Sequence, residues 1–450
     1  MELKNKLASV REYAEFVRKL YYDKNNNCNT LSIAREITFQ ITNQCNLRCS
    51  YCYEHNKQCG SMDIYTAKKC IDTILDMYEA DDNDFINHNT KALVLDFIGG
   101  EPLLEAKLIE DICDYFFHEC YKRDIPFAPF TRISFATNGQ SWFTQEAQHL
   151  FEKYHDIMSI TVSIDGIQEL HDKYRIDRYG NGSFEKAYAA FLDGKRKYGW
   201  LNSKMTFTPG SINYLFDSVK LMINNGCTII NCNFAYEPLY TIEDGKNIYN
   251  VLKKLSDYII DNKLDIFISI LDDTIGDKVD LTVDNKNYCG GTGNMLAFGV
   301  DGNAYPCIRY MPISIGNEKA SKICIGDCFN GIYKTDSEKE IKQELDNITF
   351  TSQSPEKCIE CPVSTGCGWC SGYNYELYGT PNKRYTGICY AHKGRVLASC
   401  YYYNKRYVTL GNYKPKKINL PKKEVIDIIG IENANELYRL EQDAFNRYRG

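Results

Sequence analysis

The chain has 450 residues, a formal net charge of −6 at pH 7, and 44% hydrophobic and 25% charged residues. This length predicts a large globular protein of two or three domains, and a pI near 5.8 leaves no basic surface for nucleic acid. No apolar run approaches the roughly 20 residues of a membrane span, and residues 1–20 carry charges throughout, unlike a signal peptide. We therefore expect a cytoplasmic protein with neither nucleic-acid nor membrane partners.

Twenty cysteines in a chain without an export signal indicate metal or redox chemistry, because disulfides are rare in reducing compartments. The first segment, residues 1–34, has none of the cysteine motifs described below. We expect one amphipathic helix over Leu7–Tyr22 and an asparagine-rich linker over Asp23–Asn29.

The most informative motif follows a predicted strand over Glu36–Thr42 and precedes a predicted helix over Met62–Tyr78. It consists of three closely spaced cysteines, Cys45, Cys49 and Cys52. Three thiolates are one fewer than a 4Fe-4S cluster needs, so one iron would be free to bind a small molecule. A loop after a strand is also where α/β barrels carry their active sites. Zinc or buried structural thiols are the alternatives.

Strand and helix patterns alternate from about Glu36 to Leu264. Further strands are predicted over Ala92–Ile98, Ile133–Ala136, Ile157–Val162 and Cys227–Ala235. Further helices are predicted over Leu104–Tyr121, Thr144–Tyr154, Phe184–Lys197, Tyr214–Asn225 and Gly245–Asn262. This alternation predicts an α/β fold with six strand–helix units in a partial (β/α)6 TIM-like barrel over residues 35–265.

Several of these strands end in polar or glycine residues that could contact a ligand. The strand-end candidates and the residues downstream of them are Gly99, Gly100, Glu101, Pro102, Asn138, Ser163, Asp165, Arg175 and Tyr236. Glycines at a strand end let the backbone approach a ligand closely, and a proline ends the strand. For Asn138 and Asp165 a turn-forming role is an equal alternative, and for Tyr236 ordinary barrel packing is one.

A second group of cysteines occupies residues 266–400. Its members are Cys289, Cys307, Cys358, Cys361, Cys367, Cys370 and Cys389. Taken alone, Cys358-x2-Cys361 and Cys367-x2-Cys370 would suit zinc ribbons. Two further thiols, Cys324 and Cys328, bracket an apparent strand, where a spacing of four would place them on one face.

The Cys45, Cys49, Cys52 triplet, with Tyr51 before its last cysteine, resembles the signature of radical SAM enzymes. The resemblance implies a 4Fe-4S cluster at the triplet that binds S-adenosylmethionine. It also implies that Gly99–Pro102 contact the ammonium of this cofactor and that Ser163 and Arg175 contact its ribose and carboxylate. Tyr236 lies where the family contacts adenine.

Residues 266–400 resemble the SPASM extension of radical SAM peptide-modifying enzymes, a small cysteine-rich domain with short β-hairpins and helices. The resemblance implies two auxiliary 4Fe-4S clusters, three clusters in all. Cys358, Cys361, Cys367 and Cys389 would hold the distal cluster, and Cys289, Cys307 and Cys370 the middle one. This chain departs from the usual pattern, because two residues instead of three separate Cys367 from Cys370. The middle cluster has either an open iron or a ligand from outside the motif.

These resemblances imply an enzyme, a maturase of ribosomally made peptides. It would use a 5′-deoxyadenosyl radical to abstract hydrogen and install a cross-link, which we expect to be a thioether from a cysteine sulfur to carbon. Carbon–carbon cross-linking and formylglycine formation in sulfatases are alternatives within the family. A non-catalytic iron–sulfur or zinc scaffold is the alternative outside it.

The expected partners are a cysteine-containing peptide and an electron donor of the flavodoxin or ferredoxin type. Only 44 residues precede Cys45, too few for a winged-helix leader-binding domain, so a separate leader-binding protein is a further candidate partner. Residues 401–450 are expected to form a tail that ends in a helix over Asn433–Tyr448.

Overall fold

A nine-stranded sheet organises the chain in the computed structural model, which describes residues 34–449 except 58, 200, 201, 284 and 288. The strands lie in the order β7-β6-β5-β4-β3-β2-β1-β8-β9. Their bounds are Ala34–Thr42 (β1), Ala92–Gly99 (β2), Arg132–Thr137 (β3), Met158–Ser163 (β4), Asn202–Phe207 (β5), Ile229–Phe234 (β6), Phe267–Ile268 (β7), Met295–Phe298 (β8) and Ala304–Tyr305 (β9). All neighbours pair in parallel except β8 and β9.

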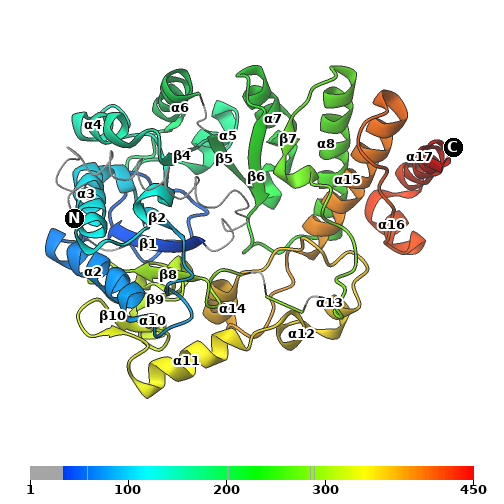
Figure 1. The fold of residues 1–450 in the computed structure, drawn as a ribbon. Helices are drawn as coiled ribbons and strands as arrows, with labels where there is room; N and C mark the ends of the chain where they lie inside the picture. Colours follow the sequence, from blue (N-terminus) through cyan, green and yellow to red (C-terminus); the bar gives the residue numbers. More distant parts are fainter. Residues whose placement is uncertain (1–33, 58, 200–201, 284, 288, 450) are drawn as a thin grey trace, which may run out of the picture.

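Helices cover the outer face of this sheet (Figure 1). They are α2 (Ile64–Ala80), α3 (Ala106–Arg123), α4 (Gln145–Tyr154), α5 (Gln168–Tyr174), α6 (Phe184–Tyr198), α7 (Leu215–Asn224) and α8 (Ile242–Asp261). Side chains of the strands alternate between buried and more accessible, as in β6, where Ile230, Cys232 and Phe234 are buried and their neighbours exposed. The buried set forms the core beneath the helices. In β1 the residues of both faces are buried from Ile37 to Thr42.

The predicted α/β alternation is confirmed. Each strand and helix predicted between residues 34 and 265 corresponds to an observed element, with ends that differ by a few residues. Strand β5 and the short helix α5 were not predicted individually. The expected helix over Leu7–Tyr22 and the linker over Asp23–Asn29 lie outside the described residues.

The C-terminal part begins as a continuation of the sheet, since β8 pairs with β1. Its other elements are short: β10 (Gly326–Asp327), β11 (Gly331–Ile332), α9 (Pro312–Ile315), α10 (Asn317–Ser321), α11 (Asp336–Asp346), α12 (Phe350–Gln353), α13 (Glu356–Ile359) and α14 (Ser371–Tyr378). The β8–β9 and β10–β11 pairs are antiparallel. These hairpins and helices match the expected small domain.

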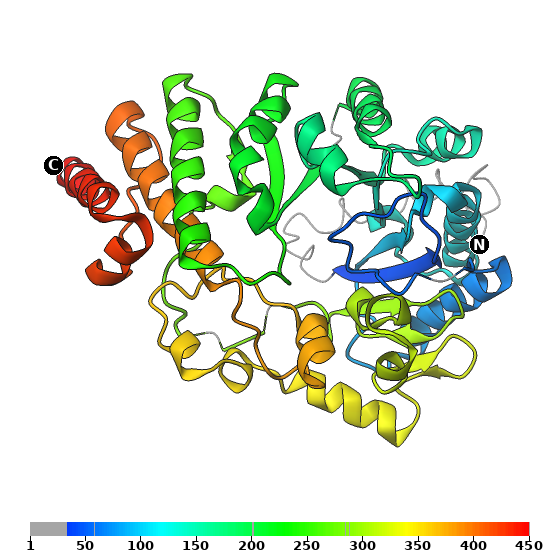
Figure 2. The same cartoon turned by 180° about the vertical axis from the view of Figure 1, so that it is seen from behind.

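A long helix then returns to the barrel. Helix α15 (Cys389–Leu410) lies beside α8, and α16 (Lys422–Ile429) and α17 (Ile431–Arg449) pack around it, as Figures 1 and 2 show from opposite sides. The expected domain boundary between residues 400 and 401 falls inside α15. Helix α17 confirms the predicted C-terminal helix.

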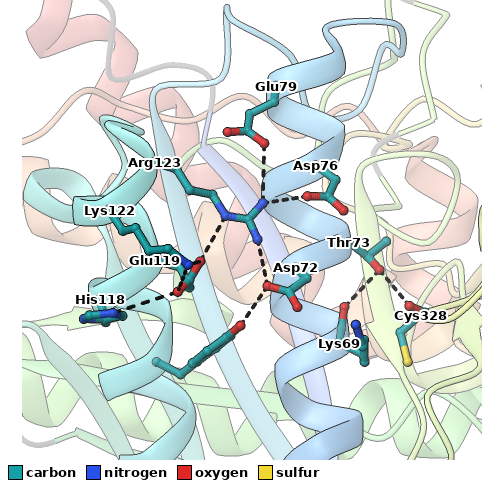
Figure 3. Close-up of polar contacts among 11 residues, drawn as sticks. Lys69, Asp72, Thr73, Asp76, Glu79, His118, Glu119, Lys122, Arg123 and Cys328 are labelled. Atoms are coloured by element: carbon teal, nitrogen blue, oxygen red, sulfur yellow. Dashed lines mark hydrogen bonds and ion pairs between the residues drawn. The ribbon is translucent and has the colours of Figure 1, made fainter.

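An ion network joins α2 to α3 on the outer face (Figure 3). The Arg123 guanidinium contacts carboxylates of Asp72, Asp76 and Glu119 at 2.8, 2.6 and 3.1 Å. On the other side of α2, the Thr73 hydroxyl donates to the Cys328 carbonyl over 3.0 Å. Helix α2 is thereby fixed both to the barrel and to the β10–β11 hairpin. None of the described helices is long and apolar enough to cross a membrane.

Candidate functional site

The Cys45, Cys49, Cys52 loop leaves the carboxyl end of β1 and runs against the glycines that end β2. The Gly100 amide donates to the Thr42 carbonyl at 3.0 Å. A Cβ atom added to Gly100 would lie 2.2 Å from the Gln44 carbonyl oxygen and 2.8 Å from Cys45 Cβ. Only glycine permits this approach, so the glycine pair brings the strand end against the cysteine loop.

Glu101 fixes the neighbouring strand ends to each other. Its carboxylate is 1% exposed and accepts hydrogen bonds from the Thr137 hydroxyl at 2.6 Å and the Asn138 amide at 2.8 Å. The Asn138 side chain in turn donates to Asn46 Oδ1 at 2.7 Å and lies 3.8 Å from Cys45 Sγ. Burial raises the pKa of Glu101 although these donors oppose the rise. Pro102 is buried at the start of the following turn. Glu101 and Asn138 therefore hold the cysteine loop to β2 and β3.

Tyr51, Asp165 and Arg175 form one buried cluster. The Arg175 guanidinium donates to both Asp165 carboxylate oxygens at 2.8 and 3.3 Å, and the Tyr51 hydroxyl donates to the same carboxylate. The Thr206 amide, on β5, donates to Asp165 Oδ1 at 3.1 Å. Burial lowers the pKa of Arg175, but the charges of Asp165, Tyr51 and Cys49 outweigh it, and the pKa is raised. This cluster links the cysteine loop to β4 and β5.

The three thiols of the triplet are largely buried, and their raised pKa values keep them protonated when no metal is bound. Burial raises the pKa of Cys45 to about 11, against an opposing charge from Lys57, and it also raises the pKa values of Cys49 and Cys52. Metal binding deprotonates such thiols. The site is thus suited to metal ligation rather than to nucleophilic catalysis by a free cysteine.

Ser163 and Tyr236, the other two predicted contact residues, are not part of the hydrogen-bonded clusters described above. Ser163 ends β4 in register with Lys204 of β5 and is partly exposed on the accessible face of the sheet. Tyr236 packs against residues of the C-terminal part. Its ring contacts Tyr373 and Tyr385, and its hydroxyl donates to the Tyr385 carbonyl at 3.2 Å. The predicted contact of Tyr236 with adenine stays a prediction.

Four thiols expected to act together line one cavity of about 90 Å³. These are Cys358, Cys361, Cys367 and Cys389, which we call the distal group. Lys357, Arg384 and Lys393 line the same cavity and would balance negative charge there. Arg384 also donates to the Cys367 carbonyl at 3.2 Å, which orients the loop that carries this thiol. The residues present fit a cluster held by four thiolates.

Cys289, Cys307 and Cys370, the middle group, are also mutual neighbours, since the charges of Cys289 and Cys370 both act on Cys307. Cys307 is almost wholly buried, and burial, followed by these charges, raises its pKa. Cys370 caps α14, with the Tyr373 amide donating to its sulfur at 3.5 Å. No fourth cysteine is a recorded partner of this group among the described residues.

Arg309, which the sequence analysis did not identify, connects the triplet loop to the middle group. Its guanidinium lies 4.8 Å from the centre of the Tyr53 ring and binds Glu237 and Glu376 at 2.8 and 3.3 Å. Its charge also acts on Cys370. The sequence offered one signal for this role, which is that Arg309 is a basic residue two positions after a candidate ligand, Cys307.

Cys324 and Cys328 do not share a strand face, because β10 contains only Gly326 and Asp327. Cys324 Sγ lies near the Gly326 carbonyl, whereas Cys328 is buried against Thr66 and Cys70 of α2. The expected strand between them is present, but it is too short to carry both thiols, so the expected shared face is wrong. Among the remaining thiols, Cys70, Cys113, Cys120, Cys227, Cys232 and Cys400 are buried, as expected of small apolar residues, and Cys59 is exposed.

Across residues 34–449, apart from the five positions left undescribed, no three Cys, His, Asp or Glu side chains converge as the ligands of a single metal ion do. A 4Fe-4S cluster does not require such convergence, since each thiolate binds a different iron.

Comparison with protein families matches residues 35–186 to the 4Fe-4S single cluster domain. An uncharacterized protein of Methanocaldococcus jannaschii is 33% identical over 149 residues, which are 33% of this chain and 43% of that protein. The radical SAM cyclopropyl synthase TigE of Paramaledivibacter caminithermalis is 22% identical over 87% of this chain and 76% of its own length. A cysteine-type anaerobic sulfatase-maturating enzyme of Clostridium novyi is 29% identical over 32% of this chain and 36% of its own. The chain thus spans less than half the length of two of these three relatives.

Solved structures share the fold. The anSMEcpe protein with bound AdoMet superposes with a TM-score of 0.60 at 17% identity, covering 88% of this chain and 98% of that one. Streptococcus suis SuiB bound to its precursor peptide SuiA gives a TM-score of 0.52 at 14% identity over 82% and 78% of the two chains. These similarities confirm the expected α/β fold.

Proposed function

We propose that the chain is a radical SAM enzyme of the SPASM type that matures a ribosomally made peptide. The observation that supports this most is the meeting of three elements at one sheet edge. These are the Cys45, Cys49, Cys52 loop, the close-packed Gly100, and the Tyr51–Asp165–Arg175 cluster. The carboxyl edge of a parallel sheet is where α/β folds bind their ligands.

In this proposal the three triplet thiols hold a 4Fe-4S cluster, and Gly99, Gly100 and Arg175 bind S-adenosylmethionine. The bound cofactors supply an electron and a 5′-deoxyadenosyl radical that takes hydrogen from the peptide. The chain's own residues position the reactants. Asp165 holds Arg175 by two hydrogen bonds, and Glu101 and Asn138 fix the loop that carries Cys45.

We further propose that the distal group holds a fully ligated cluster that relays electrons to or from a flavodoxin or ferredoxin. The middle group has three thiols and leaves a position for the thiolate of a substrate cysteine. That arrangement favours a thioether cross-link from cysteine sulfur to carbon. Arg309 contacts Tyr53 and interacts with Cys370, so it fixes the triplet loop relative to the middle group.

Formylglycine formation is the second candidate, favoured by the similarity to a sulfatase-maturating enzyme. The two reactions differ in the fate of sulfur. A thioether retains the cysteine sulfur in the product, whereas conversion of cysteine to formylglycine releases it. Mass spectrometry of a cysteine peptide after reaction separates them, and sulfur loss would contradict the thioether proposal.

Iron content tests the sites themselves. After anaerobic reconstitution we expect about 12 irons per chain, and about 8 in the Cys45→Ala, Cys49→Ala, Cys52→Ala triple variant. The triple variant should also lose all cleavage of S-adenosylmethionine to 5′-deoxyadenosine. The matched control is Cys59→Ala, which removes an exposed thiol a few residues further on and should change neither result. Bound zinc, or about 4 irons that vanish in the triple variant, would overturn the three-cluster assignment.

A further inference from the structure

Two buried hydroxyl groups lie at the middle group, and the proposed function does not yet use them. Ser371 is the first residue of α14 and is 1% exposed, and its Oγ lies 3.1 Å from Cys289 Sγ. Tyr310 is 0% exposed, and its Oη makes no hydrogen bond of ordinary geometry within the described part of the chain.

Both hydroxyls are close to more than one thiol. A Cβ atom added to Gly291 would lie 2.9 Å from Cys307 Sγ and 3.0 Å from Ser371 Oγ, so these two atoms flank one small space. The Tyr310 hydroxyl has Ser371 as a neighbour and feels the charges of Cys307, Cys289 and Cys370. The serine and the tyrosine therefore face the same three sulfurs.

A buried hydroxyl without a partner destabilises a folded protein, so the Tyr310 hydroxyl calls for an acceptor, and the Ser371 hydroxyl already lies within hydrogen-bond distance of the Cys289 sulfur. Sulfur atoms of a thiolate-ligated cluster accept hydrogen bonds, and such bonds are one of the factors that set the cluster's reduction potential. The distal group has a different lining, in which the charged side chains are the bases Lys357, Arg384 and Lys393.

We propose that Ser371 and Tyr310 donate hydrogen bonds to the sulfurs of the middle cluster and thereby raise its reduction potential. The inference rests on the proposed function, which supplies the cluster. The reduced cluster carries one more negative charge than the oxidised one, so a donor stabilises the reduced form more. A higher potential makes the middle cluster a better acceptor of one electron.

The test is a redox titration followed by electron paramagnetic resonance. The parent protein is the Cys45→Ala, Cys49→Ala, Cys52→Ala variant, which keeps the two auxiliary groups. The signal of the middle cluster is the one that a further Cys307→Ala change abolishes. Ser371→Ala and Tyr310→Phe are each expected to shift its midpoint to more negative potential, and the two together to shift it further.

Two matched variants separate this effect from structural damage. Tyr375→Phe removes a hydroxyl on the same helix, but that hydroxyl donates to the Lys319 carbonyl at 3.1 Å, so the midpoint should not move. Ser371→Thr keeps the hydroxyl and should keep the parent midpoint.

Unchanged midpoints in Ser371→Ala and Tyr310→Phe, with iron content retained, would overturn this inference alone. Iron loss in Ser371→Ala that Ser371→Thr prevents would also overturn it, since the serine would then be a ligand. A parent protein without iron would instead refute the auxiliary clusters of the proposed function, and the inference with them.

Discussion

The triplet site at the barrel edge and the two cysteine groups of the C-terminal part are built with opposite charges. At the barrel edge the buried charged residues are largely acidic, namely Glu54, Glu101 and Asp165, with Arg175 as the paired exception. In the C-terminal part they are basic, since Arg309 and Arg384 are both buried and Lys393 lines the distal cavity.

This difference matches the charges of the proposed occupants. At the triplet, S-adenosylmethionine would bring a sulfonium and an ammonium beside the cluster, and acidic surroundings favour these cations. The two auxiliary groups would hold anionic clusters alone, which basic surroundings favour. Charge, more than the number of cysteines, therefore distinguishes the two kinds of site.

The strongest test of the acidic side is Asp165→Asn. The change keeps the shape of the side chain but leaves the buried Arg175 without its countercharge. We expect a loss of about 3–5 kcal/mol in the free energy of unfolding, together with weaker binding of S-adenosylmethionine. Urea denaturation and isothermal titration calorimetry measure the two effects.

The matched control is Glu169→Gln, because this exposed carboxylate accepts one hydrogen bond from the Tyr214 hydroxyl. It should behave as the wild type in both measurements. If Asp165→Asn were as stable as this control, the buried pair would not organise the barrel edge.

Arg384→Met tests the basic side. The guanidinium is buried, donates to the Cys367 and Gly368 carbonyls, and lies 5.1 Å from the centre of the Trp369 ring. We expect a loss of about 2 kcal/mol in unfolding free energy and faster release of iron from the distal group to a chelator. Lys383→Met removes a neighbouring, exposed charge and is the control. Equal iron release from both variants would show that the charge of Arg384 is not needed.

The pH dependence of stability offers a finer test at the barrel edge. His171 is buried between the Asp165 amide and the Ser183 hydroxyl, and burial, followed by the charge of Arg175, lowers its pKa from 6.5 to about 4. The unfolded chain therefore takes up the proton first as the pH falls. Stability should decline from about pH 6.5 toward pH 4, by about 2 kcal/mol at pH 5.

His171→Asn should remove this decline, so the difference in unfolding free energy between wild type and variant should shrink from neutral pH to about pH 5. Urea denaturation at several pH values measures it. A constant difference would mean that His171 does not titrate in this window.

The sequence predicted the strand ends well, because each carries a local signal. An apolar strand followed by Gly99–Pro102 or by Asn138 marks the point where the backbone must turn. It could not predict that Asp165 and Arg175 pair, because the nine residues between them include helix α5, and the contact depends on how this helix returns to the sheet. The role of Arg309 was hidden for the same reason, since its partners Tyr53 and Glu376 are distant in the chain.

In the C-terminal part, cysteine spacing alone also failed to predict which thiols lie together. The resemblance to the SPASM extension implied the grouping of Cys358, Cys361, Cys367 and Cys389, and these four thiols do line one cavity; their spacing alone would equally have suited zinc ribbons with Cys370. The spacing of Cys324 and Cys328 suggested a shared strand face that does not exist. Strand β10 ends at Asp327, and Cys328, in the turn before β11, lies against Thr66 and Cys70 of α2.

The smallest effect is expected for Cys324, a thiol outside the two cysteine groups. Cys324→Ala should leave the iron content unchanged and alter the unfolding free energy by less than about 1 kcal/mol, since a thiol is a weak hydrogen-bond donor and this half-buried one donates to the nearby Gly326 carbonyl. Cys361→Ala, at a distal-group position of similar burial, should instead lose about 4 irons. Iron analysis of the two variants side by side measures the contrast. Because both substitutions remove one half-buried thiol, a loss of iron at Cys324 could not be attributed to packing, and it would place a fourth ligand of the middle group outside the motif.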